Sequence, residues 1–445
     1  MDQPHVVRWG TQSSLAIDNF PISGEPMPIA IVRAIAMVKS EAARVNRGAG
    51  VIEPDIADGI VAACEEIIDG LMDDQFPVDV FQTGSGTSTN MNVNEVVAHR
   101  ASELIGRPVH PNDHVNASQS SNDVVPTAVR LAVGLGLVRD VVPALRGLQE
   151  GLLSLAADHA STVKLGRTHL MDAAPITFGQ EAGGWARMVE LGIDRLAAVM
   201  VRVRELPLGG TAVGTGLNAP ETFGAEVAAA LASRTGIEWV EATNHFEAQS
   251  SHDALVEASA GCRSVALSLH KIAGDLRLLG SGPRGGLGEL ELPALQAGSS
   301  IMPGKVNPVI PEVVQQVAAQ LVGNDAAVAF AISASTLQLS TAIPVIGRNV
   351  MSSVTLLASA ARVLDEKCIR GVVVDAQRMV ALAERSASIS MILVPRIGYD
   401  AATRVAKAML QRDLSLSDAL VAEGFGADVQ VDLLALTRPG EPSSD

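Results

Sequence analysis

Residues 177–204 read TFGQEAGGWARMVELGIDRLAAVMVRVR, and their periodicity decides the fold. Apolar residues recur at intervals of about four and then three positions, at Phe178, Ala182, Trp185, Val189, Leu196, Val199 and Val203. This spacing places the whole series on one face of an α-helix, as in helices that pack lengthwise against one another. The segment therefore predicts a long, buried helix of a bundle.

Other parts of the chain repeat this pattern. Residues 121–158 carry a similar stripe, at Val124, Ala128, Leu131, Leu135, Val138, Val142, Leu145 and Leu152. Pro126 and Pro143 are expected to kink or interrupt that helix. Further helical periodicity covers residues 252–280, 309–333 and 344–371. Aromatic residues are only 3% of the chain, so the helices must pack through Leu, Val, Ala and Gly. No alternating strand pattern of similar strength occurs, and we expect an all-α fold built on a multi-helix bundle.

Composition limits the classes of partner. The 445 residues are 47% hydrophobic, enough for a large core and more than one domain. A net charge of −16 argues against nucleic acid and anionic membrane surfaces as partners. The sequence has no uninterrupted apolar run of about 18 residues, so we expect no membrane-spanning helix. The first residues lack the pattern of a signal peptide. Three widely spaced cysteines, Cys64, Cys262 and Cys368, suggest no disulfide framework and favour the cytoplasm.

Residues 298–308, GSSIMPGKVNP, are the richest in chemical groups. Pro303 and Pro308 prevent a continuous helix, and Gly298 and Gly304 permit a left-handed backbone, so a tight loop is predicted. The loop differs from a phosphate-binding P-loop, because five residues separate its glycines and Val follows its Lys.

The polar groups of this loop suit an anion. It carries the hydroxyls of Ser299 and Ser300, the ammonium of Lys305 and the carboxamide of Asn307, without an acid. Backbone N–H groups, an amide and a cation together can hold a carboxylate or a phosphate.

The loop and five other motifs resemble those of the aspartase/fumarase superfamily, whose members add or eliminate a small group across the double bond of fumarate. The other motifs follow in the family's order over nearly the whole chain: residues 84–95 (GSGTSTNMNVNE), 110–113 (HPND), 118–123 (SQSSND), 166–172 (GRTHLMD) and 209–218 (GGTAVGTGLN).

The resemblance implies a domain organisation and an assembly. Residues 1–120 are expected to form an N-terminal helical domain, 121–376 a central domain of five long helices, and 377–445 a small C-terminal helical domain. Four subunits are expected to combine their long helices, with each active site built from three subunits. No cofactor is expected. The last seven residues, 439–445, have the composition of a disordered tail.

The resemblance also assigns roles within the loop. Ser299 is expected to act as the base that takes a carbon-bound proton. Its hydroxyl is a very weak acid, so backbone N–H groups and a cation must lower its pKa. Lys305 and Asn307, with Ser300 nearby, are expected to bind one substrate carboxylate and to stabilise the doubly charged aci-carboxylate intermediate.

A second group of residues is expected to handle water. In fumarase-type members, the His of the GRTH motif acts through a water molecule, and this position is His169, preceded by Thr168 in the substrate site. A Glu that follows the loop orients that His, and the matching residue is Glu312. Because Glu312 lies where the next helix should begin, the helix dipole is expected to keep it ionised.

The resemblance implies a binding site for the second carboxylate of the substrate and for the hydroxyl of malate, the hydrated form of fumarate. This site is expected to be formed by Ser85, Thr87, Ser120, Ser121 and Asn122. Ser and Asn before a long helix are also ordinary N-caps, so residues 120–122 have a structural interpretation as well. The two roles are compatible, because a helix N-terminus is itself an anion site.

Residues 110–114 resemble a secondary dicarboxylate site, formed by His110, Asn112 and Asp113. His114 stands where the family usually has Asp. His110 and His114 have the spacing of metal ligands on a helix, but Pro111 argues against a continuous helical face and no third ligand is evident, so we expect no metal.

Small differences separate hydration from ammonia addition. Ser85, Ser121 and Gly304 resemble fumarase-type sites, whereas several segments away from the substrate groups resemble aspartases. We therefore expect reversible hydration of fumarate to (S)-malate by a carbanion mechanism, as in the tricarboxylic acid cycle. The sequence departs from the fumarase pattern at Ser340, where Asn is common, and at Pro395. An aspartate ammonia-lyase, a lyase acting on a substituted succinate and a non-catalytic scaffold remain the alternatives.

Overall fold

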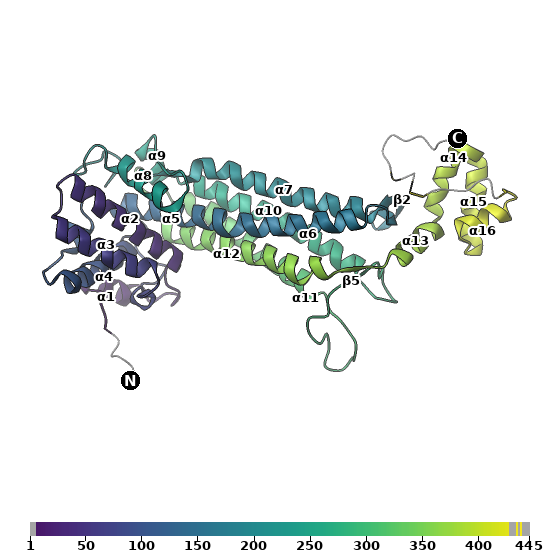
Figure 1. Cartoon of the computed structure of the whole chain (residues 1–445), viewed down its shortest axis with the longest axis horizontal. Coiled ribbons are helices and arrows are strands. Elements are labelled where there is room, and N and C mark those ends of the chain that lie inside the picture. Colours follow the sequence, from purple (N-terminus) through teal and green to yellow (C-terminus); the bar gives the residue numbers. More distant parts are fainter. Residues whose placement is uncertain (1–5, 427–432, 435–436, 438–445) are drawn as a thin grey trace. The chain divides into compact units, whose positions relative to one another are not determined.

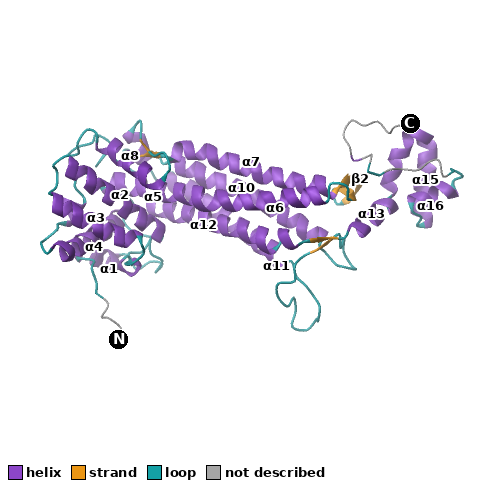
Figure 2. Ribbon diagram, in the orientation of Figure 1, coloured by secondary structure: helices purple, strands orange, loops and turns teal. Residues whose placement is uncertain are grey.

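The computed structural model describes residues 6–426, 433–434 and 437, and these residues are predominantly helical (Figure 2). Within this described part, the strands form only three two-stranded sheets. The predicted all-α fold is confirmed. The predicted disorder of residues 439–445 falls outside the described residues.

The chain divides into two compact units. Unit 1 contains residues 1–143, 192–266 and 317–359, and unit 2 contains residues 144–191, 267–316 and 360–445. Four long helices contribute residues to both units (Figure 1): α7 (Phe178–Val203), α10 (Asp253–Leu279), α11 (Val309–Ile332) and α12 (Ile343–Lys367). Each begins and ends within a few residues of its predicted range. The division into domains 1–120, 121–376 and 377–445 stays a prediction.

Unit 1 holds most of the shorter helices. They are α1 (Thr11–Asn19), α2 (Ile29–Gly48), α3 (Pro54–Ile68), α4 (Thr87–Ile105), α5 (Ser121–Gly136), α8 (Phe223–Thr235) and α9 (His245–Ser250). Its irregular turns are η1 (Asp73–Gln75), η2 (Pro111–Val115) and η3 (Leu137–Val141). Strands β3 (Glu205–Leu206) and β4 (Val240–Glu241) pair in parallel.

Unit 2 is completed by α6 (Val142–Asp158), which begins in unit 1, and by two antiparallel strand pairs. These pairs are β1 (Val163–Thr168) with β2 (Met171–Thr177), and β5 (Leu290–Glu291) with β6 (Val373–Val374). The remaining elements are η4 (Ile369–Gly371), α13 (Ala376–Arg385), η5 (Ala387–Leu393), α14 (Val394–Ile397), α15 (Tyr399–Arg412) and α16 (Leu416–Ala422).

Helix α7 buries the predicted stripe. All seven of its predicted positions are at most 7% exposed. Phe178 and Trp185 meet edge to face with ring centroids 5.9 Å apart, and the Trp185 indole N–H donates to Asp275 Oδ2 of α10 at 2.9 Å. The buried indole thus has the polar partner that its N–H requires. The prediction from residues 177–204 is confirmed.

Small residues bring the helices close together, as the low aromatic content predicts. A Cβ on Gly192 of α7 would lie 3.1 Å from Val265 Cγ2 of α10. A Cβ on Gly136 would lie 2.6 Å from Val354 Cγ1 of α12. Larger side chains at these two positions would push the helices apart, because interiors are close-packed.

The stripe predicted over residues 121–158 is exposed at one position, and two other positions, Leu135 and Val142, are only partly buried. Val138 is 40% exposed, whereas Leu137 and Val141 are fully buried. The reason is the π-helical turn η3, which inserts one extra residue and rotates the following positions. The predicted interruption is confirmed here, with Pro143 in the first turn of α6, where a missing N–H is tolerated. Pro126 lies within α5 without ending it.

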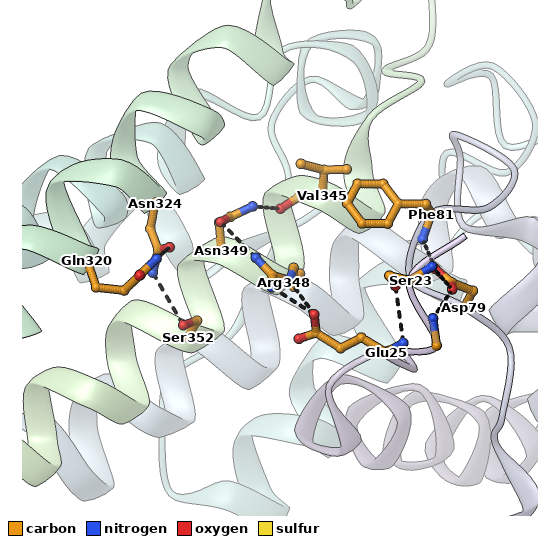
Figure 3. A network of polar contacts seen from close by, with 11 residues as sticks. Ser23, Glu25, Asp79, Phe81, Gln320, Asn324, Val345, Arg348, Asn349 and Ser352 are labelled. Atoms are coloured by element: carbon orange, nitrogen blue, oxygen red, sulfur yellow. Dashed lines mark hydrogen bonds and ion pairs between the residues drawn. The ribbon is translucent and has the colours of Figure 1, made fainter. Parts of the chain in front are cut away.

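Polar contacts attach α12 to other parts of unit 1 (Figure 3). Arg348 Nη2 lies 2.7 Å from Glu25 Oε2, and Asn324 of α11 donates to Ser352 at 3.3 Å. Nearby, the carboxylate of Asp79 accepts backbone N–H groups from residues 23, 24 and 81. Burial acts to raise the pKa of Asp79, but these hydrogen bonds outweigh it and hold the pKa at about 2.

One segment, Ile343–Gly371, has the length and apolar composition of a membrane span, with a mean hydropathy of 1.2 in its most apolar window. Of that window, 67% is buried inside the protein. The core helix of a bundle has the same composition, and this burial favours that interpretation.

Candidate active site

The loop between β5 and α11 is closed at its base by hydrogen bonds. Gly298 N–H donates to the carbonyl of Lys305 at 3.0 Å, and Asn307 Nδ2 donates to the carbonyl of Gly298 at 2.8 Å. A Cβ on Gly298 would lie 2.2 Å from the Lys305 carbonyl oxygen, so this close approach requires glycine. Gly304 has a φ of +78°, in the left-handed region. The predicted tight loop is confirmed, and Figure 1 shows it leaving the helices.

Ser299 has backbone donors directed at its side chain. The N–H groups of Ile301 and Met302 both donate to Ser299 Oγ at 3.2 Å. Hydrogen bonds of this kind favour the oxyanion over the hydroxyl and lower the pKa of the group. Lys305 and Ser300 are exposed, and among the described residues the Lys305 ammonium has no ion-pair partner. The loop therefore combines a polarised hydroxyl with an available cation.

His169 occupies the tip of the β1–β2 hairpin. Thr168 pairs with Met171, so His169 and Leu170 alone form the turn. Both have positive φ, 55° and 60°, as a two-residue type I′ turn requires. Asn and Gly normally occupy such turns, so His and Leu are strained here, and backbone strain of this kind is concentrated at functional sites. Within the described part of the chain, the exposed His169 ring has no hydrogen-bond partner, so it is free to meet a ligand.

Glu312 lies in the first turn of α11, as predicted. Its Oε1 is 3.8 Å from Arg277 Nη2 of α10. No hydrogen bond joins Glu312 to His169 among the described residues, and the pairing of these two residues stays a prediction.

In unit 1, three hydroxyls form a chain between two helix N-termini. Ser85 Oγ lies 2.7 Å from Thr87 Oγ1, which lies 2.7 Å from Ser121 Oγ. Thr87 begins α4 and Ser121 begins α5, so the positive ends of two helix dipoles meet at this cluster. The structure thus brings together two of the predicted binding stretches. Because hydroxyl hydrogens rotate, the chain can donate toward an anion.

The backbone of Thr341 and Ile343 packs against Gly84, which directly precedes Ser85 of this cluster. Ile343 N–H donates to the Gly84 carbonyl at 3.0 Å, and a Cβ on Gly84 would lie 2.0 Å from the Thr341 carbonyl oxygen. Ser340, which departs from the fumarase pattern, is 1% exposed and its hydroxyl has no partner. Because Ser340 directly precedes Thr341, this departure lies next to the segment that contacts Gly84. Pro395, the other departure, is exposed in the first turn of α14.

The N-cap interpretation of residues 120–122 is confirmed. The Asn122 N–H donates to Ser120 Oγ at 3.2 Å, and the Ser120 N–H donates to Asp123 Oδ1 at 2.9 Å. These reciprocal bonds form a capping box that fixes the first turn of α5.

Asp123 is a functional candidate that the sequence reasoning missed. Its Oδ2 accepts N–H groups from Gly209 at 3.2 Å and Thr211 at 2.9 Å, and Asn122 Nδ2 donates to the Ala212 carbonyl at 2.8 Å. Burial raises the pKa of Asp123 to about 6, against the opposing effect of its backbone hydrogen bonds. An Asp three positions after a Ser and before an apolar run is the signal of a capping box that could have found it.

Residues of the predicted secondary dicarboxylate site form hydrogen bonds with one another. His110 Nδ1 accepts the Asp113 N–H at 3.0 Å, and His114 Nδ1 accepts the His110 N–H at 2.9 Å. The side chains of His110, Asn112 and Asp113 are exposed. In the described residues, no three His, Cys, Asp or Glu side chains are grouped in a way that could hold a metal ion.

The predicted site residues are distributed over both units. Ser85, Thr87 and residues 120–122 belong to unit 1, whereas Thr168, His169 and residues 299–312 belong to unit 2. Their convergence on one substrate stays a prediction.

A family model described as lyase matches residues 1–323. The match covers more than half of the chain, and the chain therefore belongs to this lyase family.

Similar proteins show which class of lyase this chain belongs to. A class II fumarate hydratase of Corynebacterium efficiens is 51% identical over 445 residues, which cover 98% of this chain and 94% of the relative. One from Mycobacterium tuberculosis is 47% identical over 451 residues, covering 99% and 95%. The crystal structure of a class II fumarase from Schistosoma mansoni matches with a TM-score of 0.93 at 34% identity, covering 99% and 98%. Within the lyase family, the chain is thus a member of the class II fumarate hydratases, and the predicted resemblance is confirmed.

Proposed function

We propose that this chain catalyses the reversible hydration of fumarate to (S)-malate, a step of the tricarboxylic acid cycle. Family membership supports the reaction, because relatives that are 51% and 47% identical carry the name of this enzyme. The observation that carries the chemistry is the pair of backbone N–H groups on Ser299 Oγ, in a loop that also presents Lys305.

In the direction of dehydration, the Ser299 oxyanion takes a proton from C3 of malate. The C–H electron pair delocalises into the adjacent carboxylate and forms the aci-carboxylate. Lys305 and Asn307 stabilise the second negative charge, which is greatest after proton transfer, so they bind the intermediate more strongly than the substrate. Asn307 uses one amide N–H to hold the Gly298 carbonyl, and its second N–H remains for the carboxylate.

The hydroxyl of malate then leaves from C2. The electron pair of the aci-carboxylate forms the C2–C3 double bond as the C2–O bond breaks. His169 provides a proton through a water molecule, and hydroxide departs as water. Glu312 orients the imidazole, and Thr168 lies beside it. The strained turn at His169 supports this role, because it holds the ring at an exposed tip.

The other carboxylate binds at Ser85, Thr87, Ser120, Ser121 and Asn122. The N-termini of α4 and α5 favour an anion at this place. Ser300 contributes from the loop. We also propose that His110, Asn112 and Asp113 form a secondary dicarboxylate site.

We infer a homotetramer with active sites shared by three subunits. Its support is the apolar surface of the single chain, where the side chains of Phe330, Leu337 and Ile301 are 82%, 87% and 82% exposed. Subunit contacts would cover these apolar side chains, which a single chain leaves in water. A cytoplasmic location fits the three free, buried cysteines.

Proton NMR of the purified protein with fumarate in deuterated buffer, with and without ammonium, tests the function. Malate deuterated at one C3 position, irrespective of ammonium, is the expected product. Aspartate that forms only with ammonium would make the protein an ammonia-lyase. If neither product formed, the departures at Ser340 and Pro395 would indicate a different succinate derivative as substrate.

A further inference from the structure

Lys39 is a fully buried lysine whose amino group forms no ion pair with a carboxylate of the described residues. It lies on α2 with 0% exposure, and its Nζ donates to Asn116 Oδ1 at 3.2 Å and Gln119 Oε1 at 3.4 Å. Both acceptors are neutral amides, and within the described residues no acid lies within ion-pair distance of this nitrogen. Burial of an unpaired charge is costly, so its presence asks for a functional reason.

The groups around Lys39 are mostly neutral amides. Asn90 and Asn94 of α4 donate to Asn116 Oδ1 at 3.1 Å and 3.3 Å, and their own amide oxygens are buried without partners. From α3, the buried Cys64 faces the ammonium, and burial raises the pKa of this thiol to about 12. From α5, Asp123 is the acid that acts on Lys39 electrostatically.

These amides connect Lys39 to the polar cluster of unit 1. Asn90 lies one helical turn after Thr87 on α4, and Gln119 directly precedes Ser120, the N-cap of α5. Hydrogen bonds through Asn116 and Gln119 therefore link Lys39 to residues that lie next to the two helix N-termini of the cluster. The cluster itself, Ser85, Thr87 and residues 120–122, contains no cation.

We propose that Lys39 is a positioning residue that supplies the positive charge for the substrate carboxylate bound at this cluster. It acts across Asn116 and Gln119, without touching the substrate. This inference rests on the proposed function and deepens it, because it explains how neutral hydroxyls hold a dianion on a protein with a net charge of −16.

The charge on Lys39 depends on pH near neutrality. Burial lowers the pKa of Lys39 to about 7, against smaller opposing effects of Cys64 and Asp123. The free enzyme therefore carries the ammonium below about pH 7 and loses it above. A bound carboxylate favours the ammonium, so binding raises its pKa and takes up a proton. With an effective dielectric constant of about 20 and a separation on the order of 10 Å, the charge changes dicarboxylate affinity roughly ten-fold.

Three variants separate charge from packing. Lys39→Gln keeps an N–H donor for Asn116 but removes the charge, and Lys39→Met removes both. Lys407→Met is the matched control, because it removes the same charge from an exposed position on α15. For the wild type, the KM for fumarate should rise roughly ten-fold as pH increases from about 6 to about 9. Both Lys39 variants should show the high KM at all pH values, and Lys407→Met should behave as the wild type.

Calorimetry of succinate binding in two buffers of different ionisation enthalpy gives a readout that needs no turnover. Wild-type protein should take up a fraction of a proton near pH 7.5, and Lys39→Gln should not. Malate formation by the wild type, with unchanged KM and proton uptake in Lys39→Gln, would overturn this inference and leave the proposed function standing. If the KM were high in Lys39→Met but not in Lys39→Gln, Lys39 would have a packing role, and this inference would also be overturned. If the wild type formed no malate, both the proposed function and this inference would be contradicted.

Discussion

Asp123 Oδ2 accepts a hydrogen bond of 2.9 Å from the backbone N–H of Thr211, 88 residues further along the chain. The other oxygen of the same carboxylate accepts the Ser120 N–H. One buried group thus joins the start of α5 to the motif at residues 209–218. The proposed substrate groups at residues 120–122 depend on this link for their position.

Replacement of Asp123 by Asn should raise the KM for fumarate about ten-fold with a smaller effect on kcat, because an amide nitrogen cannot accept the N–H groups that the carboxylate accepts. The exposed Asp18→Asn is the control. Since burial raises the pKa of Asp123 to about 6, protonation below that pH removes an acceptor oxygen and should raise the wild-type KM.

The pH dependence of Asp123 has opposite signs for binding and stability. Its folded pKa lies above the unfolded value, so this group favours the folded state increasingly as pH falls below about 6. Substrate binding should therefore weaken before the protein unfolds in acid, as followed by KM and circular dichroism together. If the KM of Asp123→Asn increased in acid as much as that of the wild type, a group other than Asp123 would cause the increase.

Gly298→Ala should lower kcat/KM by roughly a hundred-fold or more, because small displacements of reacting groups have effects of this size. Its Cβ would collide with the Lys305 carbonyl oxygen and open the base of the loop. Gly285→Ala is the matched control, since a Cβ there meets nothing within 4 Å. Steady-state kinetics and thermal melting of both variants check this, and equal kinetics would show that the loop tolerates the displacement.

Ser299→Ala and Lys305→Ala should differ in kind. Loss of the Ser299 oxyanion should reduce kcat by roughly a thousand-fold with KM within a few-fold of the wild type, because it acts in proton transfer. Loss of the Lys305 ammonium should impair both parameters, since it binds the carboxylate in the ground state and in the intermediate. Small and equal losses in the two variants would contradict the proposed site.

Phe330→Asp should dissociate the proposed tetramer and abolish activity. The side chain is 82% exposed on α11 in the single chain, and a charge there would be buried at the interface. Light scattering coupled to size exclusion, with activity assays of each peak, measures both effects. Leu410→Asp, at a 74% exposed position on α15, is the control. An active monomer would disprove shared active sites, and an intact tetramer would place Phe330 outside the interface.

Features that depend on local sequence could be predicted, and features that depend on distant contacts could not. The helix at residues 177–204 and the loop at residues 298–308 follow from apolar spacing and from proline and glycine chemistry, and the structure has both. The exposure of Val138 was missed, because periodicity assumes a regular helix and gives no sign of the π-turn η3. The capping box of Asp123 is a local signal, but its bond to Thr211, 88 residues away, is not. Lys39 was missed because its partner Asn116 lies 77 residues away in another element.

The buried amino group of Lys39 has opposite effects on substrate binding and on the stability of the folded protein. The unfolded chain holds this proton with an ordinary lysine pKa of 10.5, whereas the folded chain holds it with a pKa of about 7. Stability from this group is therefore complete only in strong alkali and declines as pH falls toward neutrality. Met at this position would make a more heat-resistant protein that captures scarce fumarate less well. Adaptation to high temperature and adaptation to low substrate concentration would thus select different residues here.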